Sequence, residues 1–447
     1  MEFSAFIKQA AHVKPNKIQL GMLRETPFYL FVHFSPNTYT GKEWGDGTED
    51  PAIFNPTELD CEQWAKAALS VGAKGIILTA KHHDGFCLWQ SDYTEHCMKN
   101  SPYKNGKGDV VGECADACRK YGIKFGFYLS PWDRNSKYYG TEEYNDYYCN
   151  QLTELLTRYG EVFHVWFDGA CGEGPNGKKQ VYDFDRYIAL IEKYQPNAAL
   201  FNDAGTIRWC GNESGTAAHA QWGVVPMELC PRVKEIQTGA GPFAGTLDGI
   251  YNSDGDIGAL NNIIYSKGLV FAPAETDMSI RRGWFYHPEE EPHSLERLFN
   301  TYLGTVGGNT TFNLNVPPMP NGKFDERDIA RLKELGDLIR ESFDTEISTD
   351  AVIKETELSE TQSEYTVTLP EKRKISFIEL AENIAEGQRV ESFKISYKAD
   401  NGTIQQRCCC TTIGSRRIIK FNVETDLIII RITSARDKPD MEWIKLY

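Results

Sequence analysis

The chain has 447 residues, of which 41% are hydrophobic and 25% charged, a composition typical of a soluble globular protein long enough for two domains. Its formal net charge is −15 and no basic patch interrupts the acidic balance, so binding to nucleic acid or to an anionic membrane surface is not expected. No apolar run approaches the roughly 20 residues that a membrane-spanning helix needs.

The N-terminus and the cysteines bear on the compartment in which the chain works. The first residues, MEFSAFIKQAAHV, have no basic region followed by an apolar core, so no secretory signal is expected in this chain. A periplasmic or secreted location would require a signal that is removed before this sequence begins. The 12 cysteines are too dilute for a disulfide scaffold, and the adjacent Cys408, Cys409 and Cys410 lack the CxxC spacing of a metal site. We expect these thiols to be reduced and mostly buried.

From about residue 28 to 320, short apolar runs alternate with amphipathic stretches that suit helices. The runs lie at 28–34, 73–80, 123–130, 161–169 and 197–205. Continuous apolar segments of this kind are typical of parallel strands that helices cover on both faces. Repeated strand–helix units predict a (β/α)8-type, TIM-like barrel, with a doubly wound sheet as the alternative. A nucleotide-binding fold has no support, because GxGxxG does not follow the first strand and GxxxxGK[ST] occurs nowhere.

In the later part of the chain the pattern of hydrophobic residues is less regular, and its period then changes. The segments 268–275 and 309–317 are candidate strands, whereas 206–265 is rich in glycine and predicted to consist largely of loops. After a helix at 325–343, short alternating strands with turn residues between them predict an antiparallel β-sandwich. We therefore expect a barrel domain with irregular later units at 1–345 and a sandwich domain at 346–447.

Polar residues follow the predicted strands at the end where parallel barrels carry their active sites. In chain order they are His33; His82, His83 and Asp84; Ser130, Trp132 and Asp133; Asp168; Asn202 and Asp203; and Glu275. Tryptophans are expected at the same rim, namely Trp44, Trp132, Trp166, Trp209 and Trp284. Carboxylates, imidazoles and indoles together suit a neutral, hydroxyl-rich ligand whose apolar faces stack on rings.

Several of these residues also have a simpler interpretation. His82 and His83 could bind a metal with His33, but adjacent residues of a strand point apart, which favours hydroxyl binding. Asp168 could cap a helix, yet an acid directly after a buried strand is a common catalytic position in barrels. Glu213, outside these strand ends, lies in a polar loop, where a solvated surface glutamate is the ordinary interpretation, and the neighbouring Trp209 and Gly211 give only slight support to a functional role.

Five segments carry a resemblance to a known family. The chain resembles the α-L-fucosidases of glycoside hydrolase family 29 in HFSPNTYTGKEWGDGTEDP (33–51), TAKHHDGFCLW (79–89), VWFDGA (165–170), RWCGNESG (208–215) and IRRGWFYHP (280–288). The resemblance runs in order from about residue 14 to 320, and the predicted sandwich matches the second domain of that family. EWGDGTEDP and RWCGNESG look more like the subgroup that acts on α-1,3/1,4-linked branching fucose than the subgroup active on aryl fucosides.

The resemblance implies an exo-acting, retaining hydrolase that removes fucose from an oligosaccharide or glycoconjugate and uses no metal or cofactor. The nucleophile falls on Asp168 and the acid/base on Glu213, with Glu275 as the second candidate for the acid/base. The residues implied in sugar binding are His33, Glu43, Trp44, His82, His83, Tyr128, Trp166 and Trp284. Two alternatives stay open, namely a non-catalytic carbohydrate-binding protein and a metal-dependent hydrolase or isomerase using His33, His82, His83 and Asp84.

Overall fold

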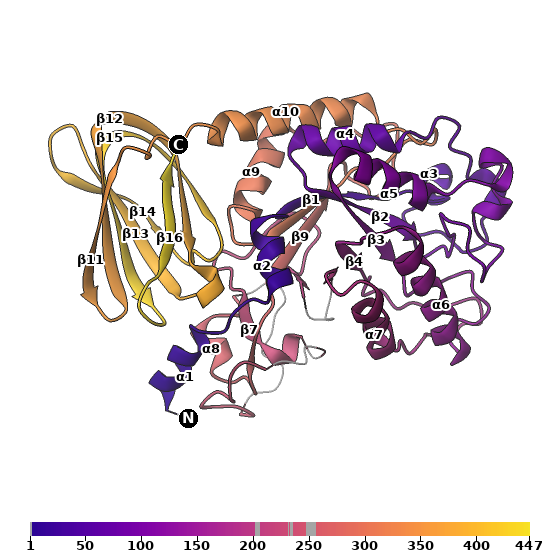
Figure 1. Cartoon of the computed structure of the whole chain (residues 1–447), viewed down its shortest axis with the longest axis horizontal. Coiled ribbons are helices and arrows are strands. Elements are labelled where there is room, and N and C mark those ends of the chain that lie inside the picture. The colour runs from indigo at the N-terminus through magenta and orange to yellow at the C-terminus, as the bar shows by residue number, and fades with distance from the viewer. Residues whose placement is uncertain (1, 202–205, 231, 233–235, 247–255) are drawn as a thin grey trace.

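A strongly curled sheet of eight parallel strands forms the larger part of the molecule (Figure 1). The computed structural model describes every residue except 1, 202–205, 231, 233–235 and 247–255. Across the sheet the strands are β5 (Ala199–Leu200), β4 (His164–Trp166), β3 (Lys124–Leu129), β2 (Gly75–Lys81), β1 (Phe28–Val32), β10 (Thr311–Asn315), β9 (Ala274–Ser279) and β6 (Arg208–Trp209). β1 to β4 and β10 coincide with apolar runs predicted to be strands, and nearly all of their residues are buried.

The barrel predicted from the sequence is open between its edge strands, β5 and β6. Among the described residues, an isolated parallel bridge between Phe201 and Ile207 joins these edges, whereas all other neighbouring strands form ladders. Each edge strand has two residues, and the chain between them is shorter than the dozen or more residues that a crossover between parallel strands requires. The TIM-like prediction therefore holds in outline, with the correction that the barrel is incomplete.

Helices cover the outside of the sheet, and several begin at an aspartate that caps them. Asp60 and Asp109 accept N–H bonds in the first turns of α4 (Cys61–Val71) and α5 (Val110–Tyr121). Both helices pack together, and α4 also packs against α10 (Glu326–Phe343). The other helices are α1 (Phe3–Ala10), α2 (Lys17–Arg24), α3 (Asn37–Thr40), α6 (Glu143–Arg158), α7 (Phe184–Tyr194), α8 (Leu260–Ile263) and α9 (Leu295–Thr305). None of the helices in the described part of the chain has the length and apolarity needed to span a membrane.

The region expected to be one strand at 268–275 contains two. β8 (Leu269–Phe271) pairs antiparallel with β7 (Val224–Pro226) in a separate small sheet, and β9 begins at Ala274 in the main sheet. Pro273 lies between them and has no N–H to donate, which explains why the strand is interrupted there. Of the strand expected at 197–205, Ala199–Leu200 is formed, and the candidate residues Asn202 and Asp203 lie outside the described part of the chain.

The chain after α10 forms an antiparallel sheet, which we call the C-terminal sheet. Its strands are β11 (Val352–Ser359), β12 (Gln362–Glu382), β13 (Val390–Lys398), β14 (Ile404–Cys410), β15 (Arg417–Ala435) and β16 (Met441–Leu446). β12 and β15 are long, and the register of their pairing changes between Thr368 and Arg373 of β12. Residues from both halves of each strand share one apolar core. The predicted sandwich is therefore approximate, because one continuous sheet covers both sides of that core.

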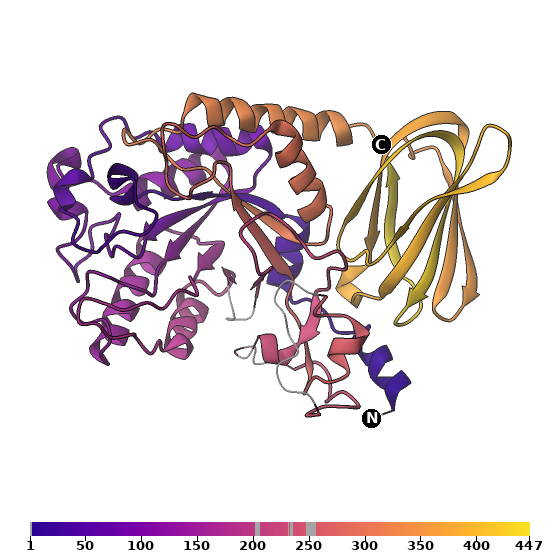
Figure 2. The ribbon, with the colours of Figure 1, turned by 180° about the vertical axis from the view of Figure 1, so that it is seen from behind.

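The C-terminal sheet packs against the side of the curled sheet that contains α9 (Figure 2). α9 contacts β15, and the N–H of Ile418 donates to the carbonyl of Gly307 at 2.8 Å. Loops of the C-terminal sheet also contact residues 219–223, which lead into β7. The C-terminal sheet thus lies against the loop that connects β6, at the open edge of the barrel, with β7.

Candidate active site

One pocket of about 190 Å³ lies at the C-terminal ends of the parallel strands. It is lined by Phe31, His33, Glu43, Trp44, His82, His83, Tyr128, Trp166, Asp168, Ala170, Glu213, Asp277 and Trp284. The lining includes every site residue implied by the family resemblance except Glu275. Of the other residues expected at this rim, it leaves out Asp84, Ser130, Trp132, Asp133 and Trp209. Its volume is below the roughly 300–1,000 Å³ of sites for drug-sized ligands, so it suits a single sugar ring.

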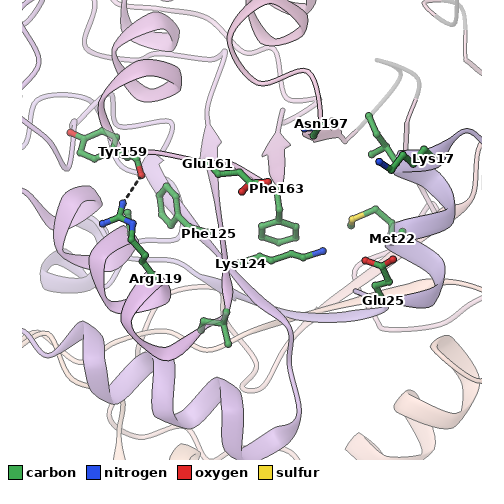
Figure 3. A pocket seen from close by; sticks show the side chains of 14 residues that line it. Lys17, Met22, Glu25, Arg119, Lys124, Phe125, Tyr159, Glu161, Phe163 and Asn197 are labelled. Atoms are coloured by element: carbon green, nitrogen blue, oxygen red, sulfur yellow. Dashed lines mark hydrogen bonds between the residues drawn. The ribbon is translucent and has the colours of Figure 1, made fainter.

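A larger cavity of about 630 Å³ lies at the opposite, N-terminal ends of β3 and β4, beside α2 (Figure 3). Phe125 and Phe163 form part of its wall, and Lys124 donates to Thr26 Oγ1 at 2.7 Å. Arg119 donates to the carbonyl of Tyr159 at 3.1 Å. This end of a barrel usually serves stability, and the chemistry of barrel enzymes lies at the other end. The smaller pocket is therefore the candidate active site.

Asp168 follows β4 by two residues and is held by hydrogen bonds on both carboxylate oxygens. Its Oδ1 accepts the N–H of Ala170 at 2.7 Å, and its Oδ2 accepts the hydroxyl of Tyr128 at 2.9 Å. His83 Nε2 lies 3.6 Å from the same Oδ2. The side chain retains 24% exposure, so the carboxylate is fixed in orientation and still accessible from the pocket.

The three histidines of the pocket are kept neutral by burial. Burial lowers the pKa of His33 to about 3 and lowers the pKa values of His82 and His83 as well. β2 ends at Lys81, so the adjacent His82 and His83 are no longer in a strand and both line the pocket, with ring centroids 4.2 Å apart. A neutral imidazole offers one donor and one acceptor, which suits sugar hydroxyls.

The hydrogen bonds of Asn315 determine which ring nitrogen of His33 carries the proton. Asn315 donates its amide hydrogens to Ser279 Oγ at 2.9 Å and to the carbonyl of Trp284 at 2.8 Å, so its oxygen faces His33. His33 Nδ1 lies 2.9 Å from that oxygen and must therefore carry the proton. Nε2 of His33 is then left as an acceptor for a ligand hydroxyl.

Glu213 reaches the pocket from an exposed loop and contacts Trp284. Trp284 Nε1 donates to Glu213 Oε2 at 3.2 Å, while the backbone N–H of Trp284 donates to Glu43 Oε2 at 2.9 Å. Loss of solvent raises the pKa of Glu213, and the charges of Asp168 and Glu43 raise it further against the opposing bond from Trp284. The pocket thus combines a fixed carboxylate with a carboxyl group that retains its proton to higher pH, as an acid must.

Indole and phenol rings form the walls. Trp166 stacks on Phe201 with ring centroids 4.0 Å apart, and Trp284 lies 4.9 Å from His33. Trp44 is 60% exposed and contacts Trp132 edge-on at the rim. The pocket therefore has apolar walls inside and an exposed aromatic ring at its mouth.

Glu275 lies beneath the pocket and outside its lining. Its carboxylate accepts Trp166 Nε1 at 2.8 Å and Asn313 Nδ2 at 3.1 Å, and it also accepts the hydroxyl of Tyr29. The side chain is fully buried, so Glu275 supports the wall residue Trp166 and does not face a ligand.

Asp277 lines the pocket and was missed in the sequence. The apolar run predicts a strand that ends at Glu275, whereas β9 continues to Ser279, so the residue two positions further along the strand reaches the rim. Trp209 Nε1 donates to Asp277 Oδ1 at 3.0 Å, and burial raises the pKa of this carboxyl well above its usual range. Phe31 and Ala170 were also missed, because small and apolar residues carry no chemical signal in a sequence.

The alternative metal site is not assembled. Asp84 accepts the Ser35 hydroxyl at 2.8 Å and the N–H of Phe86 at 2.7 Å, and it is absent from the lining of the pocket. Among the described residues, no group of three or more His, Cys, Asp and Glu side chains is arranged to hold a metal ion.

Comparisons with known proteins agree on one family. The α-L-fucosidase family model matches residues 28–226 and 247–342. Alpha-L-fucosidase 1 of Arabidopsis thaliana is 38% identical over 449 residues, covering 94% of this chain and 84% of the plant protein. A glycoside hydrolase 29 family member from an unknown rumen bacterium has a TM-score of 0.85 at 36% identity, covering 98% of this chain and 78% of its own. The Ruminococcus gnavus GH29 fucosidase in complex with fucose has a TM-score of 0.84 at 29% identity, covering 98% and 95%.

Proposed function

The chain belongs to the α-L-fucosidase family, and we propose that it is an exo-acting, retaining enzyme that hydrolyses α-1,3/1,4-linked terminal fucose from branched oligosaccharides or glycoconjugates. The observation that carries this proposal is the pairing of Asp168 and Glu213 in one pocket with neutral imidazoles. Measuring free fucose released from such a glycan tests the activity. A non-catalytic carbohydrate-binding protein would need no such pair of carboxyl groups and would release no sugar.

In the proposed first step, Asp168 attacks the anomeric carbon of fucose. The bond between that carbon and the glycosidic oxygen breaks, and Glu213 gives its proton to the departing oxygen. The product is a β-fucosyl ester on Asp168 and a free acceptor sugar. Tyr128 and Ala170 support this role, because their hydrogen bonds hold the attacking carboxylate in one orientation.

In the proposed second step, a water molecule enters the position that the acceptor sugar has left. Glu213, now ionised, takes a proton from this water. The hydroxide attacks the anomeric carbon, the ester bond breaks, and fucose leaves with its original configuration. A retaining pair of carboxyl groups lies about 5–5.5 Å apart, because no water has to fit between nucleophile and sugar in the first step.

The hydroxyl groups of fucose are proposed to bind the histidines and Glu43, and its methyl group to face Trp166 or Trp284. We predict that His82→Ala or His83→Ala lowers kcat/KM by about tenfold to a thousandfold, because buried polar groups lose their partners. Steady-state kinetics on one fucosylated glycan, with melting temperatures as a check on folding, measure this. If EDTA abolishes activity and zinc restores it, these histidines are metal ligands and the assignment is wrong.

The linkage preference is a separate prediction. Trp44 is exposed at the mouth of the pocket and belongs to the EWGDGTEDP segment, so it can contact a second sugar of a branched substrate. Binding of that remote sugar can raise the chemical rate. We expect Lewis-type α-1,3/1,4 linkages to be cleaved at least about tenfold faster, by kcat/KM, than α-1,2-linked fucose or an aryl fucoside. Comparable values on all three substrates would refute the subgroup assignment and leave the family membership intact.

A further inference from the structure

The loop that carries Glu213 has few side chains of its own to hold it. It extends from Cys210 to Gly223, and between Cys210 and Trp222 it contains no apolar residue larger than alanine. Most of its residues are exposed or half-buried. On the barrel side the N–H of Cys210 donates to the carbonyl of Glu275 at 2.9 Å, and the N–H of Gly215 donates to that of Asp277 at 3.1 Å. The second end of the loop must be held by something else.

That second end is held by side chains from loops of the C-terminal sheet. Thr411, which directly follows β14, donates its hydroxyl to the carbonyl of His219 at 2.7 Å. Gln388, which precedes β13 and is fully buried, donates to the carbonyl of Gln221 at 3.0 Å and accepts the N–H of Gly223 at 2.8 Å. One glutamine therefore binds backbone groups on both sides of Trp222.

Two further residues complete this contact, which we call the loop anchor. Arg436 lies 3.4 Å from the ring centroid of Trp222 and donates to the carbonyl of Gly258 at 2.5 Å. Asn309, which lies in the barrel between α9 and β10, donates to the same carbonyl of Gln221 at 3.0 Å and accepts the N–H of Ser415 at 2.7 Å. Gln388, Asn309, Arg436 and Trp222 are buried, so their contacts are costly to lose, whereas the bond from Thr411 to His219 is exposed.

We infer that the C-terminal sheet positions the acid/base, because Gln388 and Thr411 fix the second end of the loop that carries Glu213. Neither residue lines the pocket, so both are positioning residues that act through the backbone at 219–223. The inference rests on the proposed role of Glu213. It gives the C-terminal sheet a part in catalysis beyond covering the barrel.

The experiment compares two substrates whose need for an acid differs. A natural glycan has a poor leaving group and needs the proton from Glu213, whereas an aryl fucoside with an electron-poor phenol leaves without one. For Thr411→Val, Gln388→Ala and the double variant we expect kcat/KM on the glycan to fall, about tenfold or more in the double variant, with less than about threefold change on the aryl fucoside. The basic limb of the pH profile should also shift.

Matched controls separate positioning from general damage. Thr433→Val and Gln362→Ala remove hydrogen bonds that lie within the C-terminal sheet, and both should leave the ratio of the two substrates unchanged. Equal losses on both substrates in the Thr411 and Gln388 variants, or no loss in either, would overturn the anchor. Thr411 is partly exposed, so its valine variant remains informative if Gln388→Ala fails to fold. Glu213→Gln, measured beside these variants, distinguishes failure of the loop anchor from failure of the acid assignment. If Glu213→Gln does not lose activity selectively on the glycan, Glu213 is not the acid, and the inference about the loop anchor fails with it.

Discussion

Asp168→Gly is expected to lower kcat/KM by on the order of 10⁴-fold or more, the largest loss of any substitution in the pocket. The variant lacks the carboxylate that would form the ester, and no neighbouring group has the same position. Tyr128 and Ala170 would still line the vacated site, so it can admit a small anion. Added azide should attack the α-linked substrate directly and give β-fucosyl azide, which NMR of the product identifies.

The control for this variant is Asp46→Gly, which removes an exposed acid from the loop after Trp44 without touching the pocket lining. It should retain activity within about twofold of the wild type, as surface substitutions usually do. Substantial hydrolysis by a folded Asp168→Gly variant, or an α-configured azide product, would show that another group is the nucleophile.

The strands of the sheet could be predicted because burial on both faces leaves a continuous apolar run. Phe28–Val32 and Gly75–Lys81 are buried at every position, and the residues directly after them, His33 and His82, line the pocket. The rule that parallel strands present their C-terminal ends together was enough to bring His33, His82, His83 and Asp168 to one rim.

The open edge of the barrel could not be predicted in the same way. β5 and β6 have two residues each, which is too short for any periodic pattern to emerge. The sequence also does not show where β9 ends, and this is why it points to Glu275 and not to Asp277. Both residues lie on one face of β9, and only the position of the strand end decides which of them reaches the pocket.

Glu213 shows the limit of reading a site from local residue types. Its loop is polar and exposed, so the sequence around it favours a surface residue, and the assignment as acid/base came from the family resemblance. Its partner in the structure, Trp284, lies 71 positions further along the chain, and no local pattern predicts that contact. The loop anchor likewise joins residues that are far apart in sequence, such as Gln221 and Gln388.

Glu213→Ala is expected to lower kcat/KM on a natural fucosylated glycan by about 10²–10⁴-fold, the usual contribution of a general acid. An aryl fucoside with a good leaving group should still form the ester on Asp168, because its phenol leaves without a proton. The ester then hydrolyses slowly for want of a base, and azide, which needs none, should release it as α-fucosyl azide. The opposite configurations of the azide products from Asp168→Gly and Glu213→Ala identify the two roles separately.

The pH dependence provides a second test of the same residue. Glu213 must hold its proton to act as the acid, so activity should fall as pH rises through the pKa of Glu213. Loss of solvent and the nearby charges of Asp168 and Glu43 raise that pKa above its ordinary value, so the basic limb of kcat/KM should lie at a higher pH than an unperturbed glutamate would give. Glu213→Gln should remove this limb and leave the acidic limb in place. If Glu213→Ala hydrolyses the glycan at nearly the wild-type rate, the acid is another carboxyl group. Glu275 is buried beneath Trp166, so Asp277, whose pKa is also raised and which lines the pocket, would be the residue to replace next.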